Sequence, residues 1–390
     1  MRIQIEGKEL ISYLKEISQK VGVKSYIVGG VVRDFLLGVE NWDIDVVVEG
    51  NGIDFAYELN EYIKGELVEY PAFKTATIKK SGISIDVISA RREYYDYPAA
   101  LPRIEFADIY EDMRRRDFTI NTLAYDVLEE KILDYFGGIE DLKKGIIRVL
   151  HEKSFIDDPT RIFRAIRYSV RYSFEIEANT EALMKDSIKN ISLLSEDRIR
   201  NELFLILKEP KAKEMIEKVI EYGIDKVIFK DVPVNVDKLD VFVEDLDLSL
   251  FRLLILFYKI AEKDVEKVQK ALKLNKEHLK ALRELIFLRE EIKYRRWIRK
   301  LRETLESARN EVLKVFEVME GDKAKKIIES KPYIKGKDIK NLGVSPGPLY
   351  GELLDEVFKA KLEGRLKSKE EEISFVKNIL RVGKENTSCC

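Results

Sequence analysis

Hydrophobic and polar residues follow two different patterns along the chain, and the change falls near residue 175. Before it, short apolar runs with strand character, such as residues 26–28 and 44–48, are interleaved with helical segments. Later strand segments of this part alternate apolar and polar residues, which indicates a mixed sheet with one face covered by helices. From about residue 175 onward the pattern is almost wholly helical. We therefore predict an α+β fold, with a mixed-sheet N-terminal region followed by an all-α remainder.

Two segments near this sheet carry helical patterns of their own. Residues 3–22 place Leu10, Ile11, Leu14 and Ile17 on one stripe, which predicts an amphipathic packing helix. The apolar segment that follows Asp117 also reads as a helix, with Asn121 one turn further on.

The stretch YIVGGVVRDFLLGVENWDIDVVV, residues 26–48, combines two strands with a glycine turn and a short helix. Gly29 and Gly30 precede this helix, and Gly38 ends it. A glycine pair before a helix lets backbone N–H groups approach an anion, and the helix N-terminus adds partial positive charge. A phosphate can therefore bind at this turn, with help from Arg33.

Asp43 and Asp45 are two residues apart on the second strand, so their side chains point to the same face. Two neighbouring carboxylates beside an apolar core are costly unless a cation lies between them. The carboxylate oxygens and the nearby phosphate-binding glycine turn indicate Mg²⁺ bound to a nucleoside triphosphate, in a two-metal centre for phosphoryl or nucleotidyl transfer. The glycine turn and the pair of acids are each weak evidence alone, because acids at such positions are more often helix caps or loop residues. Their combination in one segment supports the prediction.

Composition narrows the class of protein. The chain has 390 residues, of which 45% are hydrophobic and 36% charged, which is enough for two or more domains. It has no apolar run long enough to span a membrane, and its N-terminus lacks a signal-peptide pattern, so we expect a cytoplasmic protein. Cys389 and Cys390 read as a frayed tail. The net charge of −2 means that any nucleic-acid surface must be local.

Two features between the strands and the helical part leave alternatives open. Asp86, between Ile85 and Val87, could complete a carboxylate set beside Asp43 and Asp45, or it could form a strand-end hydrogen bond. Residues 93–113 form a Tyr- and Pro-rich loop of a length at which connections become functional or disordered, and we hypothesise a mobile lid near the nucleotide.

Two further segments bring charged residues together. In RRRDFTIN, residues 114–121, the side chains of Arg116, Asp117 and Asn121 would suit a triphosphate and a ribose hydroxyl. In DDPTRIFRAIR, residues 157–167, Asp158 reads as a helix N-cap and Pro159 as the first helical residue. Three arginines share one face of that helix: Arg161, Arg164 and Arg167. On the helix pattern alone, simple capping and a solvated basic stripe are the favoured interpretations.

Two C-terminal stretches are locally basic. Residues 273–302 hold 11 Lys or Arg against 4 Glu, with Tyr294 and Trp297 among them, and residues 323–340 hold 7 Lys against 2 acids. Basic helices with interleaved aromatic residues could bind a nucleic-acid backbone. Helix faces whose basic residues form ion pairs with acidic residues are an equally favoured interpretation of either stretch.

Taken together, GGVVRDFLLG, the DID of residues 43–45, RRRDFTIN, DDPTRIFRAIR and GKDIKNLGVSPGP resemble class II tRNA nucleotidyltransferases and the related bacterial poly(A) polymerases. The resemblance covers nearly the whole chain in the right order. It implies a polymerase β-like nucleotidyltransferase head and three helical domains. The implied ranges are 1–150 for the catalytic head, 151–210 for a neck that recognises the base, 211–320 for a body and 321–390 for a tRNA-binding tail.

The resemblance also implies roles for individual residues. Asp43 and Asp45 would bind Mg²⁺, and the glycine turn, Gly29 and Gly30, would bind the triphosphate with Arg33. Three residues would contact the ribose and phosphates: Arg116, Asp117 and Asn121. Asp158 and Arg161 would read the base edge, with two arginines nearby for the phosphates, Arg164 and Arg167. One departure is Asp157, where the family has Glu, which leaves the supporting role of that position open.

The expected function is Mg²⁺-dependent, template-independent nucleotide addition to the 3′ end of tRNA, with ATP and with CTP as a further candidate substrate. The loop of residues 93–113 resembles the loop of members that add the terminal A, which ranks A-adding or CCA-adding above CC-adding activity. Basic C-terminal helices would hold the acceptor stem and TΨC arm, and no obligate protein partner is inferred. The alternatives are a bacterial poly(A) polymerase, a non-catalytic RNA-binding module and a small-molecule nucleotidyltransferase.

Overall fold

The computed structural model describes residues 4–387 apart from 6–7, 42 and 295–296. Cys389 and Cys390, which we expected to be a frayed tail, lie outside the described residues. The chain divides into two units, which are Met1–Glu202 with Lys218–Val227 and Leu203–Glu217 with Ile228–Cys390. The division into head, neck, body and tail stays a prediction.

A seven-stranded mixed sheet is the framework of the first unit, in the order β11-β10-β3-β4-β7-β6-β5. Only β4 and β7 pair in parallel; the other neighbours are antiparallel. The strands are β3 (Ser25–Val28), β4 (Asp43–Val48), β5 (Glu66–Tyr70), β6 (Thr75–Lys80), β7 (Ile83–Ser89), β10 (Leu123–Asp126) and β11 (Lys131–Asp134). The predicted mixed-sheet head and α+β class are confirmed.

Three small two-stranded sheets accompany this sheet. Their strands are β1 (Gln4–Ile5) with β2 (Lys8–Glu9), β8 (Arg91–Tyr94) with β9 (Arg103–Phe106), and β12 (Ile146–Ile147) with β13 (Glu175–Ile176). The expected loop of residues 93–113 therefore contains strand β9 and most of a helix, and only residues 95–102 connect the two strands of the hairpin.

Short helices surround the sheet in this unit. They are α1 (Leu10–Val21), α2 (Gly30–Leu36), α3 (Gly52–Ile63), α4 (Ile109–Arg114), α5 (Gly138–Lys144), α6 (Ser154–Asp157), α7 (Thr160–Tyr172) and α8 (Ala178–Ser187), with 3₁₀ turns η1 (Pro71–Phe73), η2 (Thr119–Asn121) and η3 (Ile188–Leu193). The expected helix of residues 3–22 begins only at Leu10. The predicted helix after Asp117 is wrong, because that segment is η2 followed by β10, which pairs with β3 and β11 on its two sides.

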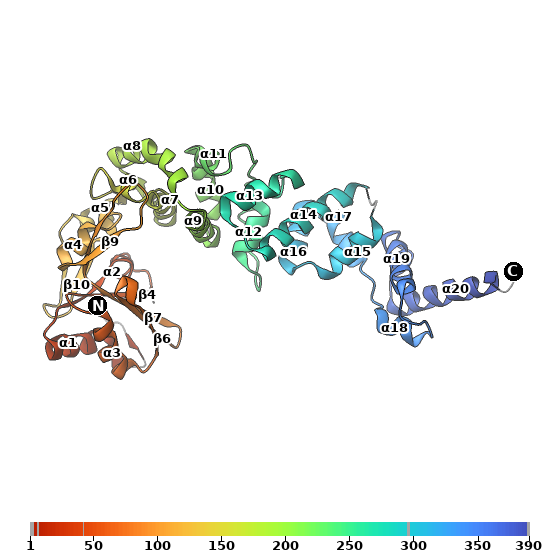
Figure 1. Cartoon of the computed structure of the whole chain (residues 1–390), viewed down its shortest axis with the longest axis horizontal. Helices are drawn as coiled ribbons and strands as arrows, with labels where there is room; N and C mark the ends of the chain where they lie inside the picture. Colours follow the sequence, from red (N-terminus) through yellow and green to blue (C-terminus); the bar gives the residue numbers. More distant parts are fainter. Residues whose placement is uncertain (1–3, 6–7, 42, 295–296, 388–390) are drawn as a thin grey trace. The chain divides into compact units, whose positions relative to one another are not determined.

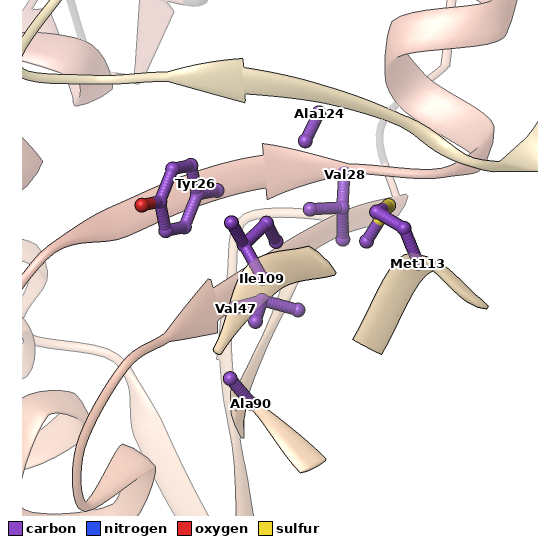
Figure 2. Close-up of a cluster of buried hydrophobic side chains, with 7 residues drawn as sticks. All are labelled: Tyr26, Val28, Val47, Ala90, Ile109, Met113 and Ala124. Carbon is purple, nitrogen blue, oxygen red and sulfur yellow. The ribbon is translucent and has the colours of Figure 1, made fainter. Parts of the chain in front are cut away.

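The two faces of the sheet are covered differently (Figure 1). Helix α3 packs on the face that carries Ile78 and Ile85, and Lys80 donates a hydrogen bond to the carbonyl of Ile63 at the end of α3. On the opposite face, α4 closes a core of buried side chains that Figure 2 shows: Tyr26, Val28, Val47, Ala90, Ile109, Met113 and Ala124. Asp45 lies opposite Val28 on the neighbouring strand, so it sits at the margin of this core.

The second unit contains helices and no strand among its described residues. Three helices have residues in both units, namely α9 (Glu196–Lys208), α10 (Ala212–Glu221) and α11 (Ile224–Phe229). The others are α12 (Leu248–Leu256), α13 (Val265–Leu272) after the 3₁₀ turn η4 (Glu262–Asp264), α14 (Lys276–Tyr294), α15 (Ile298–Ser307), α16 (Asn310–Glu320), α17 (Asp322–Glu329), α18 (Gly336–Asn341), α19 (Pro348–Leu362) and α20 (Lys369–Thr387). Within the described part of the chain, no helix is both long enough and apolar enough to cross a membrane.

Candidate active site

The glycine turn between β3 and α2 allows a close approach of side chains from elsewhere in the unit. Gly29 has a φ of +67°, and a Cβ atom added there would lie 2.6 Å from Nη1 of Arg116. Only glycine fits such a position without strain. The turn and the helix that follows it therefore stand where the sequence pattern placed them.

Arg33, on the first turns of α2, is held from both sides although it is only 3% exposed. Its Nε donates to Oδ1 of Asp34 at 2.8 Å, and its Nη1 donates to Oδ1 of Asn121. The guanidinium carbon also lies 4.8 Å from the ring centroid of Tyr172 on α7, and the Tyr172 hydroxyl donates to Asp34. Sequence reasoning gave Tyr172 no role.

The carboxylates form a row across two strands. Asp43 is exposed and Asp45 half-buried on β4, and Asp45 lies directly opposite Asp86 on β7. Asp86 also accepts a hydrogen bond from the hydroxyl of Thr77, in the middle of β7 and not at a strand end. Its membership of a metal-binding carboxylate set stays a prediction. Burial and repulsion from Asp86 and Asp43 raise the pKa of Asp45 above its usual value, although the charge of Arg116 opposes them. A bound cation would relieve this excess of negative charge.

Arg116 and Asp117 are anchored by neighbouring charges. The guanidinium of Arg116 pairs with buried Asp112 at 3.2 Å and donates to the carbonyl of Asn121, while its buried Nε has no partner among the described residues. Asp117 accepts hydrogen bonds from the Asn121 amide and, at 2.6 Å, from Nε of Arg164. Burial alone would raise the pKa of Asp117, but Arg164 and the Asn121 hydrogen bond lower it to about 2. Asp117 is therefore ionised at neutral pH.

Helix α7 begins at Thr160, one residue later than predicted, so the N-cap residue is Pro159 and not Asp158. The carboxylate of Asp158 instead accepts a hydrogen bond from the Thr160 amide at the start of the helix. The same carboxylate oxygen accepts a hydrogen bond at 2.6 Å from Arg198 on α9, whose other nitrogen donates to the carbonyl of Ala99 in the β8–β9 connection. Arg198 thus ties the connection of residues 95–102 to Asp158. Sequence reasoning missed this role, since the residues are 40 and 99 positions apart.

The arginines of α7 do not form a solvated stripe. Arg161 is 5% exposed and donates to the Ser154 hydroxyl and the carbonyl of Arg115. Arg167 is 6% exposed and pairs with Glu202 of α9. The favoured solvated-stripe interpretation is therefore wrong for these two residues, because neighbouring segments cover them.

One cavity of about 510 Å³ collects most of these side chains. Ten of the twelve predicted site residues line it, namely Gly29, Gly30, Arg33, Asp45, Arg116, Asp117, Asn121, Asp158, Arg161 and Arg164. Its lining does not include Asp43 or Arg167. Residues without a predicted role also line it, among them Arg91, Arg115, Tyr168 and Arg198. The arginines outnumber the acids, so the cavity suits a polyanion whose metal lies at the Asp45 edge.

The basic C-terminal stretches differ from one another. Between residues 273 and 302, Arg283 pairs with Glu262 and Glu266, and Arg302 pairs with Asp355, so much of this charge is neutralised within the second unit. Six of the seven lysines between residues 323 and 340 are exposed. The side chain of Tyr294 lies outside the described residues, whereas Trp297 is 62% exposed. Ion-paired helix faces thus account for part of the first stretch, and the second remains an exposed basic surface.

Comparisons with known proteins match both parts of the chain. The model described as "Poly A polymerase head domain" matches residues 25–148, and the model described as "Probable RNA and SrmB- binding site of polymerase A" matches residues 173–234. An A-adding tRNA nucleotidyltransferase of Aquifex aeolicus is 46% identical over 52% of this chain and 25% of its own length. One of Geobacter sulfurreducens is 33% identical over 92% of this chain and 46% of its own length. The chain thus spans a quarter to about half of the length of these relatives.

Solved structures cover the chain almost completely. A CCA-adding enzyme in an apo form has a TM-score of 0.75 and 30% identity, over 96% of this chain and 95% of that one. The Thermotoga maritima CCA-adding enzyme complexed with tRNA has a TM-score of 0.70 and 28% identity, over 95% of each chain.

Proposed function

Because the chain belongs to the tRNA nucleotidyltransferase family, we propose that it is a Mg²⁺-dependent enzyme that adds nucleotides, without a template, to the 3′ end of tRNA. The observation that carries the proposal is the cavity, which gathers phosphate-binding, ribose-binding and base-reading candidates beside the carboxylate of Asp45. We rank addition of the terminal A, or of C, C and A, above addition of CC alone, since both curated relatives named above are A-adding enzymes.

In this proposal, the glycine turn and the buried guanidinium of Arg33 hold the triphosphate, and Arg116 and Asn121 hold the sugar end of the nucleotide. Asp158 and Arg161 present fixed acceptors and donors to the base, which replaces a template strand. The arginines in the wall exclude water and neutralise phosphate charge without moving during the reaction.

The residues at the edge of the cavity fit a magnesium ion. Asp43 and Asp45 offer oxygen ligands, and burial first, then repulsion from Asp86 and Asp43, raises the pKa of Asp45. No three acidic, histidine or cysteine side chains of the described residues are arranged to hold a metal alone, so the nucleotide phosphates would supply further ligands. When bound, magnesium would supply charge neutralisation at the attacking and leaving oxygens.

The partner of the second unit is, in this proposal, the tRNA itself, held at the acceptor stem and TΨC arm. The exposed lysines of residues 323–340 supply a basic surface for a phosphate backbone. A cytoplasmic location and the four-domain division into residues 1–150, 151–210, 211–320 and 321–390 belong to the same proposal.

The test is single-turnover extension of three tRNAs, ending in the discriminator base, in C and in CC, with each nucleoside triphosphate alone. Extension of tRNA-CC by one A and of nothing else identifies an A-adding enzyme, whereas long A tails on unrelated RNA identify a poly(A) polymerase. Asp45→Asn should lower the rate at least about 100-fold, since a metal contributes several kcal/mol. The control Asp54→Asn, an exposed acid on α3, should leave it unchanged.

Three outcomes would overturn the proposal or part of it. An unchanged rate in both Asp43→Ala and Asp45→Ala would remove the metal assignment. Binding of tRNA by the wild type without extension of any tRNA would favour a non-catalytic RNA-binding module. A gel shift that shows no tRNA binding at low or high salt would favour a small-molecule nucleotidyltransferase, because binding through phosphates must be present at low salt and weaken as salt rises.

A further inference from the structure

The face of the sheet that carries the carboxylates continues beyond them to the edge strand. Residues that lie opposite one another on neighbouring strands point to the same face. One row across β4, β7, β6 and β5 consists of Asp45, Asp86, Thr77 and Val68. The next row, two residues further along β4, consists of Val47, Ile88, Thr75 and Tyr70.

This part of the sheet face becomes more exposed towards its outer edge. Helix α3 covers the opposite face, where Ala76 and Ile78 are buried. On the carboxylate side, Val47 and Thr77 are buried, Asp86 and Thr75 are half-buried, and Tyr70 is 46% exposed. A strip of the sheet face therefore runs from the carboxylates to β5, and it is exposed at its outer end.

The residues proposed to bind the nucleotide phosphates and sugar lie on the other side of the carboxylates. Gly29 and Arg33 follow strand β3, and Arg116 and Asn121 precede β10, while β7, β6 and β5 lie on the far side of β4. In-line transfer places the attacking oxygen and the leaving pyrophosphate on opposite sides of the α-phosphorus. If the pyrophosphate lies towards β3, the attacking 3′-hydroxyl must come from the side of β7.

Aromatic rings border the strip at its outer end. Tyr70 ends β5, Phe73 follows in the turn η1 with 58% of its surface exposed, and Phe106 on β9 is 52% exposed. The ammonium of Lys74 lies 3.3 Å from the centroid of the Phe106 ring. Arg91, which lines the cavity, donates to the carbonyl of Phe73 at 3.1 Å, so this turn adjoins the cavity. Single-stranded RNA binds to such surfaces by stacking its bases on exposed rings.

We propose that this strip, bordered by Tyr70, Phe73 and Phe106, is the subsite for the last unpaired nucleotides of the RNA acceptor. The bases stack on the rings, Lys74 faces the RNA backbone, and the terminal ribose lies over the row of Asp45 and Asp86. This inference rests on the proposed function, because it assigns a place to the RNA substrate of the same site.

The experiment compares Tyr70→Ala and Phe73→Ala with the wild type in single-turnover extension of a tRNA ending in CC, with enzyme in excess and ATP saturating. Loss of one stacked base lowers the second-order rate constant for RNA about 5- to 100-fold, whereas the KM for ATP stays unchanged. Tyr70→Phe and Phe73→Tyr keep a ring and restore the rate. The matched control is Tyr57→Ala, a 52% exposed tyrosine on α3 at the opposite face, which leaves the rate unchanged. Unchanged melting temperatures exclude unfolding as the cause.

A second acceptor separates stacking from other effects. An RNA whose last two nucleotides lack their bases should react slowly with the wild type, and Tyr70→Ala should slow it no further. Normal extension by both alanine variants, or equal losses on the intact and abasic acceptors, would overturn the inference while the proposed function stands. Failure of the wild type to extend any RNA would instead overturn the proposed function.

Discussion

The ion pair between Asp117 and Arg164 gives the sharpest quantitative prediction. Asp117 has a pKa of about 2 in the folded protein against a usual value of 3.8. By linkage, this difference contributes about 2 kcal/mol to stability at pH 7. Because the folded pKa is the lower one, the contribution is present above the usual pKa and is lost as pH falls towards 2.

A double-mutant cycle measures this contribution. Asp117→Asn and Arg164→Met, singly and together, should show a coupling energy of about 2 kcal/mol at pH 7, because each single change leaves a buried charge without its partner. The coupling should be nearly complete at pH 5 and fall by about half at pH 3.

The assay is urea unfolding of the wild type and the three variants, followed by circular dichroism at pH 7, 5 and 3. A coupling energy below about 0.5 kcal/mol at pH 7, or one that stays constant between pH 5 and pH 3, would refute the reasoning.

Three further predictions test contacts that connect distant segments. Arg198→Met frees Asp158 and should reduce the preference between ATP and CTP about tenfold, measured by competition of the two nucleotides in single-turnover extension. Tyr172→Leu removes the ring beside Arg33 and should weaken ATP binding about 3- to 10-fold, and Tyr172→Phe should weaken it less; titration of a fluorescent ATP analogue checks both. Arg252→Met removes the hydrogen-bond donor of two buried carbonyl groups, one on α9 and one just after it. This change should lower the unfolding free energy of the C-terminal unit by about 1–3 kcal/mol, measured by calorimetry.

Much of the candidate site could be predicted because it depends on local pattern. A period of two places Asp43 and Asp45 on one face of a strand, and the glycine pair before a helix creates a turn in which Gly29 has a positive φ that favours glycine. The order Asp-Pro-Thr likewise placed the start of α7 to within one residue, and Asp158 accepts a hydrogen bond from the Thr160 amide there, although the N-cap is Pro159.

Other features depend on contacts between distant segments. The segment after Asp117 has enough apolar residues for a helix, yet strands on both sides pair with it and make it β10. The hydrogen bond between Tyr172 and Asp34 joins residues 138 positions apart, and Arg198 reaches the Ala99 carbonyl across 99 positions. No periodicity within one segment could reveal these partners.

The basic stretches show the same limit for charge. Both have an excess of lysine and arginine in the sequence, but Arg283 and Arg302 meet acids from other helices, whereas most lysines of residues 323–340 stay exposed. Local charge therefore predicts where cations gather, and tertiary packing decides which of them remain free for a partner.

The most direct test of the account is a crystal structure with Mn²⁺ in place of Mg²⁺ and a non-hydrolysable ATP analogue. We predict an anomalous peak beside the carboxylates of Asp43 and Asp45, with the triphosphate of the analogue running from that peak towards Arg33 and the glycine turn. A nucleotide bound elsewhere, or bound in this cavity with no metal at these two carboxylates, would contradict the central claim.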